Sequence, residues 1–416
     1  MSNKVPKTVS IITIGDELLI GQTIDTNSAW MAQELNKAGF SINRRVAIGD
    51  SWDDIWNCLQ EEEEKNDIVL ITGGLGPTSD DITKPLLCNY FGGKLIVDDA
   101  AKENVIEIFT KKLNRPLLER NLKQAEVPDV CTVILNKRGT APGMWFEKNN
   151  KIFVSMPGVP FEMKGMMADY VIPALTKKFE VSPVEHRTLL TAGIGESFLA
   201  ELLNDFEASL INGIKLAYLP NYGMVRLRLT ATQTLENKNE IDFYFDQLKK
   251  TVNDHLVIDR DISLQEAIAE TLKSEGKTLA IAESCTGGYI SHLFTLLPGS
   301  SSFFLGSVVS YSNKLKSELL GVPETILNKF GAVSIETVNK MAEGIREKTG
   351  ADYGLATSGI MGPTGETPGK PVGFVCVGFS SKEKTENTTF QFRFDRKRNI
   401  ELTAVHALNF LRKSIG

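Results

Sequence analysis

The chain has 416 residues, and its 46 Lys and Arg residues against 52 Asp and Glu residues give a formal net charge of −6 at pH 7. That balance argues against a protein that coats nucleic acid or an anionic membrane, because such proteins need a positive field. At about 150 residues per domain, the length predicts two or three domains. A composition of 42% hydrophobic and 24% charged residues is typical of ordinary globular domains.

The 5 cysteines form no Cys-x-x-Cys pair, and the 4 histidines are far apart in the sequence. A disulfide-stapled scaffold and a zinc module are therefore both disfavoured. No segment approaches the ~18 uninterrupted apolar residues of a membrane helix. The first apolar run, residues 9–14, has the length of a strand and not of a signal peptide. We expect a cytoplasmic protein.

Residues 1–172 alternate short β-branched runs with segments of helical period. Strands are expected at 8–14, 41–48 and 67–71, and helices at 27–38 and 52–65. Such alternation predicts a mostly parallel sheet with helices on both faces, in which ligands bind at the carboxyl ends of the strands.

The rest of the chain divides into two further domains. Residues 173–258 predict a small α+β connecting domain, KH-like but without a Gly-x-x-Gly loop, with strands at 187–192, 213–218 and 224–231 and helices at 196–207 and 239–253. Residues 259–416 predict strands at 279–282, 305–311, 353–357 and 372–379 and helices at 264–274, 286–297, 335–348 and 396–412. We therefore expect two separate α/β domains with parallel or mixed sheets, joined by the small domain.

The first chemical loop is residues 72–81 (TGGLGPTSDD), between an expected strand and a helical pattern. Glycines there let backbone N–H groups converge on an anion, and the helix N-terminus adds its positive end. The loop lacks the Gly-Lys-[Ser/Thr] ending of a nucleotide triphosphatase and the spacing of a dinucleotide fingerprint. Asp80 and Asp81 suit a magnesium-assisted phosphoryl reaction, because hard cations take oxygen ligands. They equally suit helix capping, so both interpretations stay open.

Four further polar or Gly/Pro-rich turns accompany this loop: residues 15–21 (GDELLIG), 25–27 (DTN), 136–143 (NKRGTAPG) and 156–163 (MPGVPFEM). Together they resemble the molybdopterin-binding-like N-terminal domain of the CinA family of competence/damage-inducible proteins. The resemblance implies a nucleotide-like ligand or, as in some members, metal-dependent hydrolysis of ADP-ribose to AMP and ribose 5-phosphate. It implies a divalent cation such as Mg²⁺ at Asp80 and Asp81. The implied ligand contacts are Gly73, Gly74, Gly76 and Asn27.

The second chemical loop is residues 282–288 (AESCTGG), which also follows an apolar strand and opens a helix. A nucleophile at such a turn is exposed, and the amides of the helix start can form an oxyanion hole. Ser284 needs a base, and the two histidines of this domain fall inside expected helices. A Ser–His–Asp triad is therefore disfavoured, which leaves a lysine base. Lys316 could reach the same strand-end surface, whereas Lys314 is the solvent-facing alternative.

Several segments here resemble the C-terminal domain of the CinA family, which is similar to stand-alone nicotinamide mononucleotide (NMN) amidohydrolases: residues 282–288, 311–316 (YSNKLK), 331–334 (GAVS), 357–363 (TSGIMGP) and 369–373 (GKPVG). The resemblance covers residues 259–416. It implies hydrolysis of the NMN carboxamide to nicotinic acid mononucleotide and ammonia, without a cofactor. Ser284 would be the nucleophile, Lys316 its base and Tyr311 a near neighbour. The mononucleotide site would be lined by Thr286, Gly287, Ser358 and Gly359, with Arg396 as a phosphate contact.

Two alternatives at this second loop stay open. The family usually carries a Gly-Asp-Arg turn before its last helix, whereas residues 394–398 read FDRKR, so Arg398 competes with Arg396. Cys285 competes with Ser284, because a thiolate beside a helix N-terminus is the better nucleophile. Glu283 with Lys316 could complete a Cys–Glu–Lys arrangement. We favour Ser284 on the resemblance.

The leading hypothesis is a homodimeric two-site enzyme of pyridine-nucleotide recycling that acts on NMN and ADP-ribose. A divalent metal is expected for the first site and none for the second. The alternative is a molybdopterin- or nucleotide-binding module in cofactor assembly without hydrolase activity, which would not need Ser284 and Lys316. Direct contact with nucleic acid, which the family name invites, is disfavoured by the net charge and the lack of a DNA-binding motif.

Overall fold

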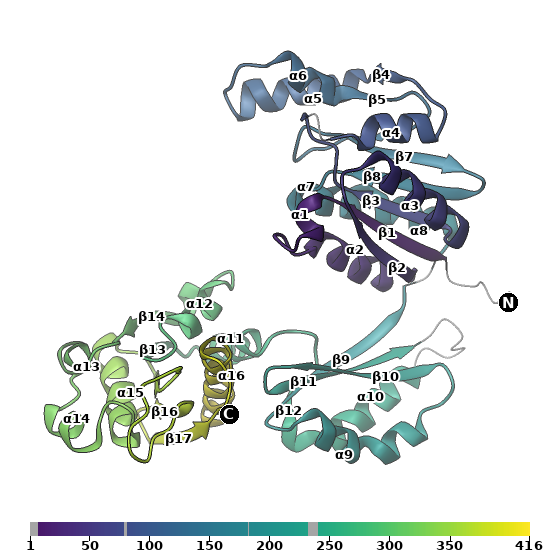
Figure 1. Ribbon diagram of the computed structural model, residues 1–416. Coiled ribbons are helices and arrows are strands. Elements are labelled where there is room, and N and C mark those ends of the chain that lie inside the picture. The colour runs from purple at the N-terminus through teal and green to yellow at the C-terminus, as the bar shows by residue number, and fades with distance from the viewer. Residues whose placement is uncertain (1–6, 79–80, 182, 232–239) are drawn as a thin grey trace. The chain divides into compact units, whose positions relative to one another are not determined.

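The computed structural model describes residues 7–78, 81–181, 183–231 and 240–416. The chain divides into two compact units, Met1–Glu185 and His186–Gly416, whose elements are labelled in Figure 1.

The first unit is built on a six-stranded sheet in the order β2-β1-β3-β8-β7-β6. The first four strands of this order run parallel, and β7 and β6 are antiparallel. A separate two-stranded ladder joins β4 and β5. The strands are β1 (Thr8–Ile14), β2 (Ser41–Ile48), β3 (Ile68–Thr72), β4 (Leu95–Val97), β5 (Glu126–Pro128), β6 (Thr132–Ile134), β7 (Gly143–Lys148) and β8 (Lys151–Met156).

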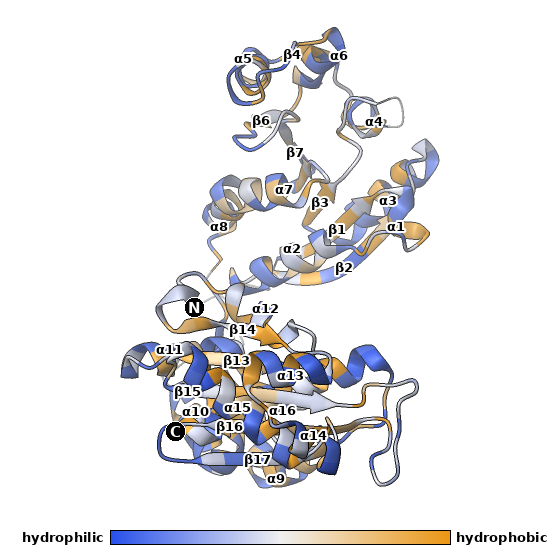
Figure 2. Ribbon diagram, turned by 90° about the vertical axis from the view of Figure 1, so that its left-hand side faces the viewer, coloured by the Kyte–Doolittle hydropathy of each residue, from blue (hydrophilic) through white to orange (hydrophobic). Residues whose placement is uncertain are grey.

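Helices cover both faces of this sheet, because the central strands are apolar on both sides. On β1, Val9 and Ile11 pack in one core with α2, α7 and α8, whereas Ile12 and Ile14 pack in the other with α3 and α4. Figure 2 shows the hydrophobic colouring of β3, all of whose residues are buried. The helices are α1 (Asp16–Leu19), α2 (Thr26–Lys37), α3 (Trp52–Lys65), α4 (Thr83–Tyr90), α5 (Asp99–Glu107), η1 (Ile108–Lys112), α6 (Glu119–Leu122), η2 (Lys123–Ala125), α7 (Pro160–Met166), η3 (Met167–Val171) and α8 (Ile172–Phe179).

The second unit begins with a four-stranded sheet in the order β10-β11-β9-β12, against which two helices pack. Leu199 and Leu203 of α9 and Ile241 and Leu248 of α10 fill this small core. The elements are β9 (Glu185–Ala192), α9 (Glu196–Ser209), β10 (Ile214–Asn221), β11 (Met224–Ala231), α10 (Glu240–Thr251), η4 (Asn253–His255) and β12 (Leu256–Ile258).

The same unit continues into a five-stranded mixed sheet in the order β14-β13-β15-β16-β17. β13 lies between β14 and β15 and is parallel to both, whereas β16 and β17 are antiparallel additions. The strands are β13 (Leu279–Glu283), β14 (Phe304–Val309), β15 (Tyr353–Gly359), β16 (Phe374–Ser380) and β17 (Thr385–Gln391).

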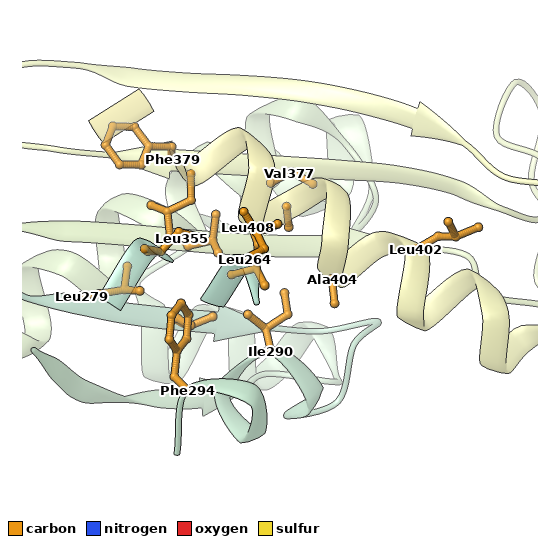
Figure 3. Packing of buried hydrophobic residues seen from close by; sticks show 14 of the residues in the cluster. Leu264, Leu279, Ile290, Phe294, Leu355, Val377, Phe379, Leu402, Ala404 and Leu408 are labelled. Atoms are coloured by element: carbon orange, nitrogen blue, oxygen red, sulfur yellow. The ribbon is translucent and has the colours of Figure 1, made fainter. Parts of the chain in front are cut away.

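Alternate residues of β13 fill two cores on opposite faces of this sheet. Leu279 and Ile281 pack with α11, α12 and α16, whereas Ala280 and Ala282 pack with α13, α14 and α15. Figure 3 shows the first core, in which Leu408 of the last helix lies close to Leu355. The helices are α11 (Leu264–Glu275), α12 (Tyr289–Thr295), η5 (Ser300–Ser302), α13 (Asn313–Leu320), α14 (Glu324–Phe330), α15 (Ile335–Thr349) and α16 (Arg396–Ile415).

The predicted fold class is confirmed: two α/β domains with mixed sheets flank a small α+β domain. Two elements of the C-terminal domain differ from the prediction. The helix expected from Thr286 begins only at Tyr289, because Gly287 and Gly288 have positive φ angles. The strand β17 was not predicted, since its sequence, TENTTFQ, is largely polar. Across the part of the chain that is described, no helix has the length and apolarity to span a bilayer.

Candidate functional site

The second chemical loop lies where three parallel strands end. β13 ends at Glu283 and leads directly into Ser284, whose backbone N–H donates to the carbonyl of Thr357 on β15 over 3.0 Å. On the other side, Ser310 follows β14 and donates its N–H to the carbonyl of Glu283 over 2.8 Å. The carboxyl ends of β13, β14 and β15 thus meet at one sheet edge, as expected for a ligand site in this class of fold.

Ser284 and Lys316 are in direct contact at this edge. The Nζ atom of Lys316 lies 3.0 Å from the Oγ of Ser284 and donates to the carbonyl oxygens of Ser310 at 2.7 Å and Tyr311 at 3.3 Å. Lys316 belongs to α13, which Ser312 caps. The lysine side chain therefore reaches the serine because the chain turns back immediately after β14.

Burial gives Lys316 the properties of a base. Its side chain is 1% exposed, and desolvation lowers its pKa to about 8. A neutral amine has two hydrogens and one lone pair. If the hydrogens go to the carbonyls of Ser310 and Tyr311, the lone pair faces the Ser284 hydroxyl. The pair has the geometry of a nucleophile and its general base.

Cys285 is less suited to be the nucleophile. The residue is 5% exposed, and desolvation raises the pKa of its thiol to about 12. A reactive cysteine needs a lowered pKa, which Cys285 lacks. Ser284 is also buried, at 8% exposed, so the raised thiol pKa and the contact between Ser284 and Lys316 separate the two candidates, and exposure does not.

The start of α12 is already occupied by a carboxylate of the protein itself. Glu283 is fully buried and accepts hydrogen bonds from the backbone N–H groups of Gly288 at 3.0 Å, Ile290 at 3.2 Å and Ser291 at 2.9 Å, and from the Ser291 hydroxyl. The amides of Gly288, Ile290 and Ser291 are therefore not available to form an oxyanion hole. The N–H of Thr286, in the turn itself, has no partner among the described residues and remains available.

Glu283 is likewise not arranged as a member of a Cys–Glu–Lys site. Its carboxylate oxygens accept from the helix start, whereas the described partners of the Lys316 ammonium are Ser284 and two carbonyl groups. Of the residues at the end of β13, Ser284 is the one whose side chain contacts Lys316.

The two candidate arginines are in different surroundings. Arg396, the first residue of α16, donates to the carbonyl of Gly362 at 2.8 Å and to the hydroxyl of Tyr311 at 3.0 Å. Tyr311 is 62% exposed, so this pair lies at the surface beside the serine–lysine pair. Arg398 instead stacks its guanidinium 4.1 Å from the ring centre of Phe394. Arg396 is therefore the arginine that the fold brings to the site.

The remaining predicted residues of this site support its shape. The hydroxyl of Thr286 lies 2.8 Å from that of Thr357, and both residues are buried. Ser358 is 1% exposed and donates to the carbonyl of Ala332 at 2.7 Å, so its hydroxyl is committed to the protein. A Cβ atom at Gly359 would lie 2.8 Å from Val375, which explains the glycine there.

The first chemical loop follows β3 and is shaped by its glycines. Gly73 and Gly74 have φ angles of 115° and 64°, and a Cβ atom at Gly73 would lie 2.2 Å from the carbonyl oxygen of Ile14. The carboxylate of Asp81 accepts from the N–H of Gly76 at 2.7 Å and of Thr78 at 2.9 Å. An anion bound by these loop amides would have to replace that carboxylate.

The described residues do not form a metal site at this loop. Within the described part of the chain, no group of three or more His, Cys, Asp or Glu side chains could hold a metal ion. Asp81 is engaged by amides, and Asp80 lies outside the described residues.

Asn27 lies at the same edge of the first sheet. Its amide donates to the carbonyl of Gly158 at 2.7 Å and to the hydroxyl of Thr72 at 3.4 Å. Its Oδ1 atom is buried and has no partner among the described residues. Asn27 thus links the ends of β3 and β8 and keeps one acceptor unused.

Sequence reasoning missed a second buried lysine in the first unit. Lys84 is 8% exposed, donates to the carbonyl of Gln124 at 2.9 Å, and has a pKa lowered to about 8 by burial. The signal was available, because Lys84 shares one face of α4 with the buried Leu87 and Cys88. Its one described hydrogen bond goes to a backbone carbonyl, so it has no nucleophile to activate.

The chain matches three family models in order. Residues 10–177 match the probable molybdopterin binding domain, residues 186–257 the damage-inducible protein CinA KH domain, and residues 261–415 the CinA C-terminal domain. The KH-like middle domain expected from the sequence is thereby confirmed.

Relatives match over nearly the whole chain. A CinA-like protein of Cytophaga hutchinsonii is 43% identical over 408 residues, covering 97% of both chains. A CinA-like protein of Flavobacterium psychrophilum is 40% identical over 409 residues, covering 98% of both. The crystal structure of the competence damage-inducible protein A from Klebsiella pneumoniae is 31% identical, covers 36% of this chain and 93% of that chain, and has a TM-score of 0.36. The chain therefore belongs to the CinA family, with a molybdopterin-binding-like domain, a KH domain and a CinA C-terminal domain in that order.

Proposed function

We propose that the C-terminal domain is an amidohydrolase that converts NMN to nicotinic acid mononucleotide and ammonia. The observation that carries this proposal is the 3.0 Å contact between the Oγ of Ser284 and the Nζ of Lys316, in a buried environment that lowers the pKa of the lysine. The substrate follows from the resemblance of the surrounding motifs to NMN amidohydrolases. A binding module without hydrolase activity would not need this pair.

The proposed reaction has two stages. Neutral Lys316 takes the proton of the Ser284 hydroxyl while the Oγ attacks the carboxamide carbon, and the carbonyl oxygen becomes an oxyanion. The lysine ammonium then gives its proton to the leaving nitrogen as the C–N bond breaks, which releases ammonia and leaves an ester on Ser284. In the second stage, water attacks this ester with Lys316 as base, releasing the carboxylic acid and restoring both side chains.

Two other features fit an anionic mononucleotide. The Glu283 carboxylate occupies the amides at the start of α12, so the substrate phosphate must be bound elsewhere. The exposed guanidinium of Arg396 beside Tyr311 provides a phosphate contact near the reacting pair. The Thr286 amide is the proposed donor to the oxyanion.

For the N-terminal domain we propose binding of a phosphorylated riboside such as ADP-ribose at the glycine loop. The proposal is supported by the exposed amides of Gly76 and Thr78, which already hold a carboxylate, and by the unused acceptor of Asn27. The described residues offer no cluster for the divalent metal that hydrolysis of ADP-ribose would need, so the proposal for this domain is binding.

A substrate panel tests both proposals. NMN, ADP-ribose, NAD and FAD are each incubated with wild type, Ser284→Ala and Asp81→Ala, with and without magnesium. We expect ammonia from NMN alone, independent of magnesium, and lost only in Ser284→Ala. We expect Asp81→Ala to bind ADP-ribose at least about threefold more tightly than wild type, because the ligand no longer has to displace the Asp81 carboxylate from the amides of Gly76 and Thr78. Ammonia release that survives in Ser284→Ala would overturn the first proposal, and equal ADP-ribose affinity would overturn the second.

A further inference from the structure

The buried carboxylate of Glu283 lies directly beside the proposed nucleophile in the chain, and the proposed mechanism does not use it. We infer that Glu283 is a positioning residue: it fastens the turn that carries Ser284 to the start of α12 and so holds the nucleophile against its base. The inference rests on the proposed hydrolase function and deepens it, because it names the side chain on which the nucleophile's geometry depends.

Among the described residues, the hydrogen-bond partners of the Glu283 carboxylate all lie at the start of α12. Its two oxygens accept from the backbone N–H groups of Gly288, Ile290 and Ser291 and from the Ser291 hydroxyl, and the side chain has no exposed surface. A buried carboxylate is costly unless its lone pairs are satisfied, and the N-terminal amides of a helix supply both donors and a favourable dipole. This contact therefore holds the end of β13 against the start of α12.

The turn between Glu283 and the amides that it binds is short. Glu283 is the last residue of β13, and the amides that it binds begin at Gly288, so the intervening residues 284–287 form a closed loop. Positive φ angles of 60° at Gly287 and 98° at Gly288 let the chain curl back onto the carboxylate. Ser284 is the first residue of this loop, and its position is set by the loop's closure.

The backbone of Glu283 also connects the nucleophile to the base. Its carbonyl accepts from the N–H of Ser310 at 2.8 Å, and the carbonyl of Ser310 accepts from the Nζ of Lys316 at 2.7 Å. Ser284 is fixed on the other side by the carbonyl of Thr357. A change in the Glu283 side chain releases the turn from the start of α12 while these backbone contacts to the base remain, and a displacement of about 1 Å is enough to slow a positioned reaction about 100-fold.

A purely structural role for Glu283 makes a different prediction. If the carboxylate only stabilises α12, its loss lowers the fraction of folded protein but leaves each folded molecule fully reactive. If it positions Ser284, each folded molecule becomes less reactive while its affinity for a reactant stays the same. The rate per folded molecule separates the two roles.

The test measures labelling of Ser284 in the full chain by a small fluorophosphonate, in which the Oγ attacks phosphorus and fluoride leaves. The variant is Glu283→Gln, which keeps the shape of the side chain but places an amide donor against the helix amides. We expect its maximal labelling rate per folded molecule to fall at least about tenfold, with the half-saturating probe concentration unchanged. A maximal rate within about twofold of wild type would overturn the inference.

The matched control is Glu266→Gln. Glu266 accepts from the N–H of Ser263 at 2.7 Å in the capping box of α11, so it is also a carboxylate at a helix N-terminus of this domain. We expect this variant to lose stability and to label at the wild-type rate per folded molecule. A drop equal to that of Glu283→Gln would overturn the inference, because any helix cap would then have the same effect.

A second variant covers the case in which Glu283→Gln does not fold. Ser291→Ala removes one of the four donors to the carboxylate and leaves its three amide contacts. We expect labelling about threefold slower than in wild type, and an unchanged rate would overturn the inference. The probe reports on Ser284 whatever its natural substrate is, so a failure to hydrolyse NMN would overturn the proposed function without deciding the role of Glu283.

Discussion

The two chemical loops of this chain have the same construction and different chemical capacity. Each follows a buried strand, bends through glycines with positive φ, and binds a carboxylate of its own, Asp81 in the first loop and Glu283 in the second. A buried lysine with a pKa lowered to about 8 is close in sequence or in space to each. Only the second lysine meets a hydroxyl, because Lys84 donates to a carbonyl whereas Lys316 contacts Ser284.

This difference separates a binding loop from a reactive one. Glycine amides and a helix start can hold an anion, but amide hydrolysis also needs a nucleophile within reach of a base. Ser284 of the second loop contacts the buried Lys316, whereas the described hydroxyl of Thr78 in the first loop donates to the Asp81 carboxylate, which also accepts from loop amides. Lowered lysine pKa values therefore do not by themselves identify an active site in this chain.

The largest expected effect comes from removing the nucleophile. Ser284→Ala should lower the rate of NMN hydrolysis at least ~1,000-fold, because no other described hydroxyl contacts Lys316. Cys285→Ala is the matched control and should keep the rate within about threefold, since the thiol is buried with a raised pKa. Steady-state ammonia release measures both, and the opposite pattern would move the nucleophile to Cys285.

Replacing each buried lysine with methionine distinguishes the general base from a lysine that is only buried. Lys316→Met should lower the rate of NMN hydrolysis about 100- to 1,000-fold through loss of the general base, whereas Lys84→Met should leave it unchanged.

The thermal unfolding of Lys316→Met gives an independent readout. The pKa of Lys316 is lowered from 10.5 to about 8 in the folded chain, so burial of the charged lysine lowers the free energy of unfolding. This loss of stability is complete below pH 8 and disappears as the pH rises towards 10.5. Near pH 7, Lys316→Met should therefore raise the free energy of unfolding by as much as about 3 kcal/mol. A lower free energy of unfolding in Lys316→Met than in wild type would contradict an unfavourable buried charge at Lys316.

The pH dependence tests the state of Lys316 without a mutation. The base must be neutral, and its pKa is lowered to about 8, so kcat/KM should rise with pH and level off above that value. Between about pH 6 and pH 9 the neutral fraction of such a group changes about 100-fold. A rate that is flat over this range would contradict a lysine base.

The smallest effect is expected at the arginines. Arg396→Ala should raise the KM for NMN about tenfold through loss of a charge-assisted contact with the phosphate, with little change in kcat. Arg398→Ala, whose guanidinium stacks on Phe394, should change KM less than about threefold. Initial rates over a range of NMN concentrations distinguish them, and a larger effect at Arg398 would reverse the assignment.

Much of this architecture could be predicted from local pattern. The strand at Thr8–Ile14 has the predicted bounds because a run of mainly apolar, β-branched residues specifies it locally. The helix at Trp52–Lys65 also has the predicted bounds, because it is amphipathic and Ser51 caps it. The strand β17 could not be predicted, since its polar residues are held by pairing with β16 and not by burial.

The site divides in the same way. Ser284 could be predicted from its turn, and its approach to Lys316 from the end of the neighbouring strand. The sequence could not show that Glu283 takes the helix amides, because that contact depends on how residues 284–287 curl in space. The choice between Ser284 and Cys285, and between Arg396 and Arg398, likewise depended on burial and partners that only the folded chain provides.

The central claim is that Ser284 and Lys316 form an amide-hydrolysing site, and ammonia release from NMN by the wild-type full chain tests it most directly. Between about pH 6 and pH 9, without added metal, we expect one ammonia and one nicotinic acid mononucleotide for each NMN consumed, with a higher rate at the alkaline end. The absence of ammonia release at every pH in this range would contradict it.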